Sequence, residues 1–228
     1  MLRPTLLLLA LALLGCEGPR YVTVQVEIPD LEGTPTPLRG VTVTALPFDR
    51  DSLVQAMERE HGGSRPHVGR LDSLYDTFRG PFLDYFRADQ RRAAVSDSVS
   101  KGQLPQSALD NAEAQVATAR EALSKARDAV GGPIDSLRAA VSRWEDSTYR
   151  GFDSRAKALM DTTGGKPVSD TTDARGTTTL TLRPLPGGWW VSASSWDPLD
   201  PNRIWYWNVR VESDTVRLDD KSGQHRSR

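Results

Sequence analysis

Apolar and polar residues alternate at both ends of the chain, and this pattern predicts β-strands. From Tyr21 to Ile28 every second residue is apolar, and Val41-Thr-Val-Thr-Ala45 repeats the alternation before Pro47 ends it. A period of two is typical of an antiparallel strand with one buried face. Residues 177–182 and 189–196 alternate too, each after a Gly-containing turn. Because a single hairpin is marginal in water, we expect these strands to pair with the two early ones.

The remaining β-signals lie near the C-terminus. Ile204-Trp-Tyr-Trp-Asn-Val-Arg-Val-Glu212 predicts a long strand, and Thr215-Val-Arg-Leu218 predicts a short strand at a sheet edge. The polar tail from Asp219 is expected to fray. Pro29 to Gly40 is interpreted as a loop, and Asp161 to Gly176 as a polar linker.

Between the two β-regions the apolar spacing changes to three and four, which predicts helices. Asp49-Arg-Asp-Ser52 offers caps for a short helix that stops at His61-Gly62-Gly63. A longer helical pattern starts near Val68 and ends before Gly102 and Pro105. Pro81 lies inside that pattern and predicts a kink or a break.

A heptad repeat follows, with large and small apolar residues in turn. Its members are Leu109, Ala112, Val116, Ala119, Leu123, Ala126 and Val130. Gly131-Gly132-Pro133 then predicts a turn, with Pro at the first position of another helix. We therefore expect residues 105–160 to form an antiparallel helical hairpin that resembles a coiled coil.

Together these elements predict an α+β fold, a small antiparallel β-sandwich split by a long antiparallel helical hairpin or coiled-coil insertion. Such an insertion is tolerable because loop-closure entropy grows slowly with length. The predicted parts are a leader at 1–15, the first part of the sandwich at 16–50, the helical insertion at 51–162 with its hairpin at 105–160, the second part of the sandwich at 170–218 and a polar tail at 219–228.

The N-terminus has the pattern of an export leader. Arg3 precedes an apolar run from Leu6 to Leu14, which is too short to span a bilayer as a helix. The run ends in Leu13-Leu14-Gly15-Cys16, which resembles the lipobox of bacterial lipoproteins. The resemblance implies cleavage after Gly15, acylation of Cys16 with chains such as palmitate, and anchorage in an envelope membrane. An ordinary secretory leader with a chance cysteine is the alternative.

Three features refine this view of the anchored protein. Glu17, rather than Asp, follows the cysteine, and in the lipoprotein family this favours the outer membrane. The chain has 29 basic and 30 acidic residues, so its charge gives no reason to expect nucleic acid as a partner. Its single cysteine excludes an intramolecular disulfide.

In the first β-region, Thr36-Pro-Leu-Arg-Gly-Val-Thr-Val-Thr-Ala45 resembles one turn and strand of the carboxypeptidase regulatory-like domain, a transthyretin-like β-sandwich. Thr172-Asp-Ala-Arg-Gly176, Leu180-Thr-Leu182 and Leu185-Pro-Gly-Gly-Trp-Trp-Val-Ser-Ala193 are similar to later ones. The chain departs from the family in the helical residues between the two halves. The resemblance implies a non-catalytic accessory, adhesion or scaffold module.

A second resemblance points to a different role. Residues 107–123 look like the helical hairpin of periplasmic adaptor proteins from efflux and secretion systems. That resemblance implies docking of a tip near Lys101–Gln106 on a membrane channel. The flanking segments, however, lack the Gly-x-Val pattern of the lipoyl-like domain that carries the hairpin in those adaptors.

The sequence shows no catalytic motif of a hydrolase or metalloprotease and no complete phosphate loop. We therefore expect no enzymatic activity, cofactor or metal. Three groups of residues could supply metal ligands, but turn-forming or solvated roles explain them better. They are Asp170 with Asp173, Asp197 with Asp200, and His61 with Glu58 or Glu60.

Aromatic residues supply the candidate binding surface. By alternation Trp189, Val191 and Ala193 belong to the core, as do Trp205 and Trp207. The opposite, outer face carries the candidate binding residues Trp190, Trp196, Tyr206, Asn208 and Arg210. Exposed aromatic rings stack on sugars or contact proteins, so an envelope protein or a glycan is the expected partner. The alternative is that the helical insertion covers this face.

Overall fold

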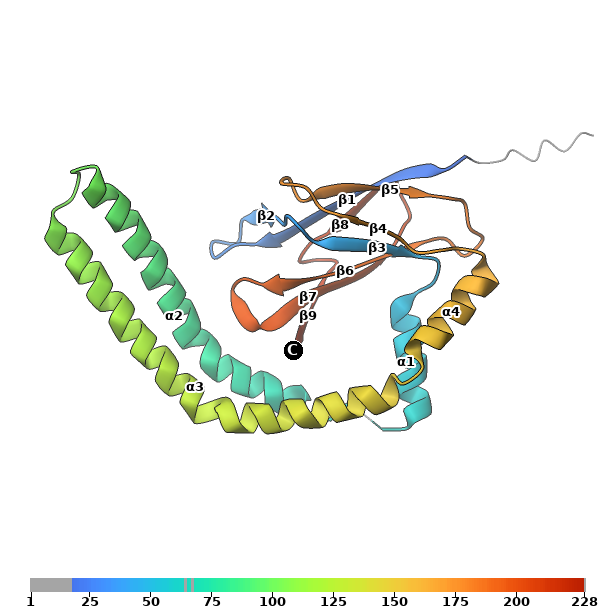
Figure 1. The fold of residues 1–228 in the computed structure, drawn as a ribbon, viewed down its shortest axis with the longest axis horizontal. Helices are drawn as coiled ribbons and strands as arrows, with labels where there is room; N and C mark the ends of the chain where they lie inside the picture. Colours follow the sequence, from blue (N-terminus) through green and yellow to red (C-terminus); the bar gives the residue numbers. More distant parts are fainter. Residues whose placement is uncertain (1–17, 64, 67, 228) are drawn as a thin grey trace, which may run out of the picture.

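The computed structural model describes residues 18–63, 65–66 and 68–227, which form a mixed α+β protein. In this part of the chain there are four helices and nine strands. The strands gather into two layers, and a long pair of helices extends away from them to one side (Figure 1). The predicted leader, Gly15 and Cys16 lie outside the described residues. Within the described ranges, no helix is both long and apolar enough to cross a membrane.

Both sheets combine strands from before and after the helices. In the four-stranded sheet, β1 (Arg20–Pro29) pairs with β2 (Pro35–Pro37) and β5 (Thr177–Leu182) antiparallel and with β8 (Thr215–Leu218) parallel. The five-stranded sheet is antiparallel in the order β4 (Val168–Thr171), β3 (Thr42–Leu46), β6 (Trp190–Asp197), β7 (Asp200–Arg210) and β9 (Gln224–Ser227). The expected pairing of late strands with early ones is therefore confirmed.

The apolar faces of the two sheets share one core. Val22, Val24 and Val26 of β1 are fully or almost fully buried, and they belong to the same cluster as Val191 and Trp207 of the other sheet. Each buried side chain of this size contributes about 1.5–3 kcal/mol. The alternation read from the sequence thus identifies the inward faces correctly.

The turn before β5 shows why this register is specific. The Asp173 carboxylate accepts the backbone N–H groups of Thr177 and Arg175, and these hydrogen bonds hold the pKa of Asp173 below its usual value. Gly176 has a φ of +69°, and a Cβ there would lie 2.6 Å from the carbonyl oxygen of Val26. Only glycine allows this close approach of the turn to β1.

The first helix, α1 (Arg50–His61), begins and ends as expected. The Asp49 side chain accepts the backbone N–H of Asp51, and Gly62 ends the helix in the left-handed region. Its apolar face buries Leu53 and Met57 against Ala156 of α4 (Phe152–Thr163).

The helical hairpin is real, but its predicted position is wrong. It consists of α2 (Val68–Ser100) and α3 (Gln106–Thr148), which lie side by side and join at a loop that begins at Lys101 (Figure 1). The heptad residues between 109 and 130 are covered or partly covered, whereas most positions between them are exposed, so the repeat forms the seam with α2. The expected hairpin at 105–160 does not exist, because α3 continues through the predicted turn at 131–133.

Packing explains why α3 continues where the sequence suggested a turn. Proline inside a helix costs roughly 3 kcal/mol and removes one backbone hydrogen bond. Val130, Ile134 and Leu137 flank Pro133 and are buried against Leu71 and Tyr75 of α2. Burial of three such side chains outweighs that cost. Figure 1 shows α3 changing direction along its length, as helices with internal proline commonly do.

Three further expectations are corrected. Of the kink or break predicted at Pro81, the break is absent, because α2 continues through the proline. The linker 161–176 contains the end of α4 and the strand β4, and the loop 29–40 contains β2. The tail is not frayed, because β9 pairs with β7 and its His225 lies 3.9 Å from the Trp205 ring centroid.

The continuity of α3 yields a prediction about stability. Gly132 lies inside the helix, and a Cβ there would meet nothing within 4 Å, so Gly132→Ala should stabilise the protein by about 1 kcal/mol. Gly102→Ala is the matched control, because Gly102 also has open space but a φ of +69° and should lose about 1–2 kcal/mol. Urea unfolding of both variants measures the difference. Destabilisation by Gly132→Ala would contradict a continuous helix.

Candidate functional site

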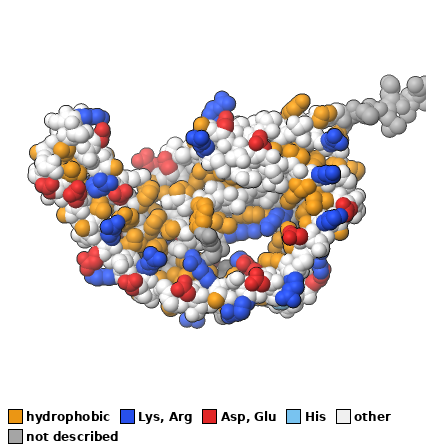
Figure 2. Space-filling view, in the orientation of Figure 1, with side chains coloured by type: hydrophobic (Ala, Val, Ile, Leu, Met, Phe, Trp, Pro, Cys, Tyr) orange, Lys and Arg blue, Asp and Glu red, His pale blue; other side chains and the backbone are white. Residues whose placement is uncertain are grey.

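A cavity of about 1240 Å³ lies between the helices and the five-stranded sheet. Its walls come from α1, the segment after α1, the start of α2, the second half of α3 and the strands β7 and β9. Figure 2 shows the molecule hollowed between the sheets and the helices, with basic side chains (blue) around the hollow. Among the described residues five arginines line it, namely Arg50, Arg65, Arg138, Arg203 and Arg226.

The wall formed by α1 follows from its helical period. Asp51, Gln55 and Glu58 recur every three or four residues and line the cavity together with Val54. The opposite stripe of α1 contacts α4. The helix therefore presents one apolar face to its neighbour and one mixed face to the cavity.

The wall formed by α3 has the same spacing. Arg138, Val141, Ser142 and Glu145 lie on one face of the helix, and Tyr149 follows one turn later. Val141 is buried, so this wall offers apolar surface between charged groups. Phe152 at the start of α4 adds an aromatic edge.

The sheet closes the cavity where β7 and β9 pair. Ile204 is opposite Arg226 in the register, and Arg203 precedes it. The Arg226 guanidinium lies 3.4 Å from the centroid of the Tyr206 ring and 3.2 Å from an Asp51 carboxylate oxygen. The C-terminal strand therefore brings a cation to the cavity that no local sequence pattern predicts.

Three cavity carboxylates are already bonded to neighbouring side chains. Asp51 accepts from Tyr206 Oη at 2.9 Å and from Arg226. Glu58 accepts from Tyr149 Oη at 2.6 Å. Glu145 accepts from Arg65. Two of these carboxylates thus form ion pairs with arginines, and the third accepts a hydrogen bond from a phenol.

Arg50 differs from these groups in its surroundings. It donates one hydrogen bond to Tyr206 Oη at 3.1 Å, and its guanidinium lies 5.4 Å from the ring centroids of both Phe152 and Tyr206. Within the described part of the chain, no carboxylate lies within 4.0 Å of it. Cation–π attraction to these two rings favours this position of the guanidinium. Most of its five donors remain available to other partners.

Burial raises the pKa of two tyrosines near this site. For Tyr149 burial is the largest cause, and the hydrogen bond to Glu58 acts in the same direction. For Tyr206 burial also dominates, although Arg50 opposes it. Both phenols therefore remain protonated donors at neutral pH.

The structure uses two of the predicted binding residues to attach α1 to the sheet. Asn208 donates to Asp49 at 2.6 Å, and Tyr206 bonds to Arg50 and Asp51. Tyr206 is buried and Asn208 half-buried. The alternative, in which helices cover this face, therefore applies to these two residues.

The other three predicted residues lie nearer the surface. Trp190 is opposite Arg210 in the β6–β7 register; Trp190 is half-buried and Arg210 is exposed. Trp196 is 50% exposed near the end of β6. The five residues share the outer face of one sheet, but the structure does not bring them into one site.

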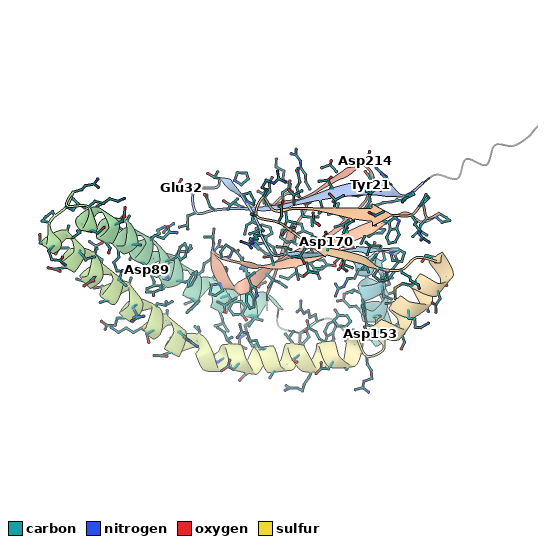
Figure 3. The ribbon with its side chains drawn as sticks, turned by 45° about the horizontal axis from the view of Figure 1, so that its top comes forward. Tyr21, Glu32, Asp89, Asp153, Asp170 and Asp214 are labelled. Atoms are coloured by element: carbon teal, nitrogen blue, oxygen red, sulfur yellow. The ribbon has the colours of Figure 1, made fainter. Side chains whose placement is uncertain are left out.

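The acidic clusters weighed as metal ligands have other roles. Asp197 and Asp200 are buried and accept the backbone N–H groups of Leu199 and Asn202, and burial raises the pKa of Asp200. Asp170 on β4 bonds to Thr178. Figure 3 shows Asp89, Asp153 and Asp170 on separate elements. The described residues contain no group of three or more side chains that could hold a metal ion.

The cavity was not predicted, because its walls come from elements far apart in the chain. A sequence signal for the cavity walls does exist. It is the stripe of polar residues on each helical segment, 51–58 and 138–149, which lies opposite or beside a stripe of apolar residues.

Comparison of the chain with known protein families, curated proteins and solved structures finds no match.

The raised pKa of Tyr149 predicts a pH dependence. Unfolded tyrosine releases its proton near pH 10, whereas folded Tyr149 retains it at higher pH. The stabilisation is therefore complete below about pH 10 and is lost as the pH rises further. We expect Tyr149→Phe to lose less unfolding free energy between about pH 10 and 12 than the unmodified protein.

Urea unfolding at several pH values, followed by tryptophan fluorescence, measures how steeply the free energy of unfolding falls with pH. Tyr21→Phe on exposed β1 is the control and should behave like the unmodified protein. Equal slopes for Tyr149→Phe and the unmodified protein would refute the assignment.

Proposed function

We propose that this protein is a non-enzymatic, lipid-anchored envelope lipoprotein that acts as a binding module. The observation that carries the binding role is the cavity between the helices and the five-stranded sheet. Ligand sites are usually concave, with apolar walls and a few converging polar groups, and this cavity combines both kinds of lining. The proposed partners are the lipid bilayer through acylated Cys16 and an envelope protein or glycan. No nucleic acid and no cofactor are involved.

The anchor is proposed from the sequence. Leu13-Leu14-Gly15-Cys16 follows an apolar run and contains the only cysteine of the chain. Several acyl chains on one residue hold a protein on a bilayer far more firmly than a single chain does. With Glu17 after the cysteine, the outer membrane is the proposed location.

For the scaffold we propose a carboxypeptidase regulatory-like, transthyretin-like β-sandwich that the helical segment interrupts. Support comes from the places that the matching motifs occupy. Residues 36–45 lead into β3, residues 172–176 form the turn before β5, and residues 185–193 lead into β6. Each motif thus lies at a junction of a turn and a strand, as in that family.

A lipidation assay tests the anchor. Cells that produce the full chain with a C-terminal tag are grown with an alkyne analogue of palmitate, and membranes are separated from soluble protein. We expect label and protein together in the membrane fraction, and loss of both for Cys16→Ser. Glu17→Gln is the control and should keep the label. Unlabelled soluble protein from the unmodified chain would show an ordinary secretory leader instead.

A second candidate function is an adaptor for an efflux or secretion channel. One observation favours it, because the hairpin of α2 and α3 ends at Lys101, within the predicted tip, and projects beyond the sheets (Figure 1). The loop residues 101–105 are all exposed. In this alternative the hairpin supplies the contact and the cavity is secondary.

Charge reversal at the tip distinguishes the two candidates. Lys101 and Lys125 are both exposed, and each pairs with an acidic residue one turn earlier, Asp97 or Glu121. If the tip docks on a channel, Lys101→Glu should abolish capture of a channel component from detergent-solubilised envelope, whereas Lys125→Glu should retain it. Equal capture by both variants would exclude the tip as the contact.

A further inference from the structure

The lining of the cavity indicates the chemistry of its ligand. Besides the arginines it carries the carboxylates of Asp51, Glu58, Asp72 and Glu145 and a set of apolar side chains. The apolar lining consists of Val54, Leu71, Val141, Phe152, Pro201 and Ile204. A ligand that fits this surface needs both a charged and an apolar part.

The charge expected of the ligand depends on which charged side chains of the cavity wall lack an ion-pair partner within the protein. Asp51, Glu58 and Glu145 already accept hydrogen bonds from Tyr206, Tyr149 and Arg65, respectively. Arg50 has a phenol and two aromatic rings around it and no carboxylate within ion-pair distance among the described residues. Asp72 also has an interaction partner within the protein. Arg50 is therefore the charged group of the wall best placed to bind a ligand group of opposite charge.

The geometry of Arg50 suits an oxyanion. A guanidinium offers a planar fork of donors that matches carboxylate or phosphate oxygens. The hydrogen bond to Tyr206 and the two neighbouring rings position the Arg50 guanidinium before the ligand arrives. Val54 lies one turn along α1 from Arg50, and the centroid of the Phe152 ring lies 5.4 Å from the Arg50 guanidinium. An anionic group at Arg50 would thus have apolar surface next to it.

We propose that the cavity binds an organic anion that carries an apolar group, with its carboxylate or phosphate at Arg50. This inference rests on the binding role proposed above and specifies the class of ligand. A free metabolite and a single-chain anionic lipid share this chemistry. The cavity volume of about 1240 Å³ exceeds that of common small-molecule sites, so either one fits.

The test uses the chain from Gly18 to Arg228, which contains all the apolar clusters and the whole cavity wall. The probe is 8-anilinonaphthalene-1-sulfonate, whose fluorescence rises on binding. Competitors are dodecanoate, hexanoate, inorganic phosphate and dodecyltrimethylammonium, with the amphiphiles kept below their critical micelle concentrations. We expect both carboxylates to displace the probe. If the natural ligand is a lipid, dodecanoate should displace the probe better than hexanoate. The cationic amphiphile and phosphate should not displace it.

Variants locate the binding and control for loss of fold. Arg50→Gln should weaken probe binding about tenfold, whereas Arg127→Gln on the exposed side of α3 makes the same change in net charge and should have no effect. Gln55 is exposed on the cavity wall, and its side chain makes no hydrogen bond to the other described residues. Gln55→Glu should therefore weaken probe binding about fivefold, and Gln55→Lys should strengthen it. Near-ultraviolet circular dichroism confirms that each variant is folded.

Three results would overturn the proposal. These are absence of probe binding to the folded chain, equal displacement by the cationic amphiphile, and Gln55 variants of opposite charge that bind the probe equally. Such results would leave the lipid anchor standing, because the lipidation experiment measures it separately.

Discussion

The structure depends on the burial of strand faces that come from both sides of the helical segment. β1 pairs with β5 and β3 pairs with β6, so no sheet is complete until residues more than a hundred positions apart meet. This pairing also holds the ends of the helical segment together, because α1 follows β3, α4 precedes β4, and β3 pairs with β4. The approach is close, since a Cβ on Gly165 would lie 2.5 Å from Pro47.

A few polar contacts then set the helices on the sheet. Asp49 caps α1 and also accepts from Asn208 of β7, so one carboxylate serves both the helix and its attachment. Burial acts to raise the pKa of Asp49, but the hydrogen bonds from Ser52 and Asn208 lower it overall. Arg50 and Asp51 continue this contact through Tyr206. The cavity exists because α1 is held here while α3 approaches from the other side.

The cavity and the core between the sheets differ in the kind of side chains that line them. The core is closed and apolar, and its indole N–H groups find backbone acceptors, as when Trp207 donates to Asp219 at 2.8 Å. The cavity instead keeps five half-buried arginines near apolar side chains. The binding role proposed above accounts for this arrangement.

The sequence by itself determined the local features: the alternating strands, the buried faces, the caps of α1 and the heptad seam from Leu109 to Val130. Those features depend on side-chain period and on hydrogen bonds within a few residues. Tertiary structure decided what long-range packing controls. It carried α3 through Pro133, because Ile134 and Leu137 gain more by burial against α2 than the proline costs. It also turned a polar tail into β9 and gathered Arg50, Arg138 and Arg226 around one cavity, since each arginine comes from a different element.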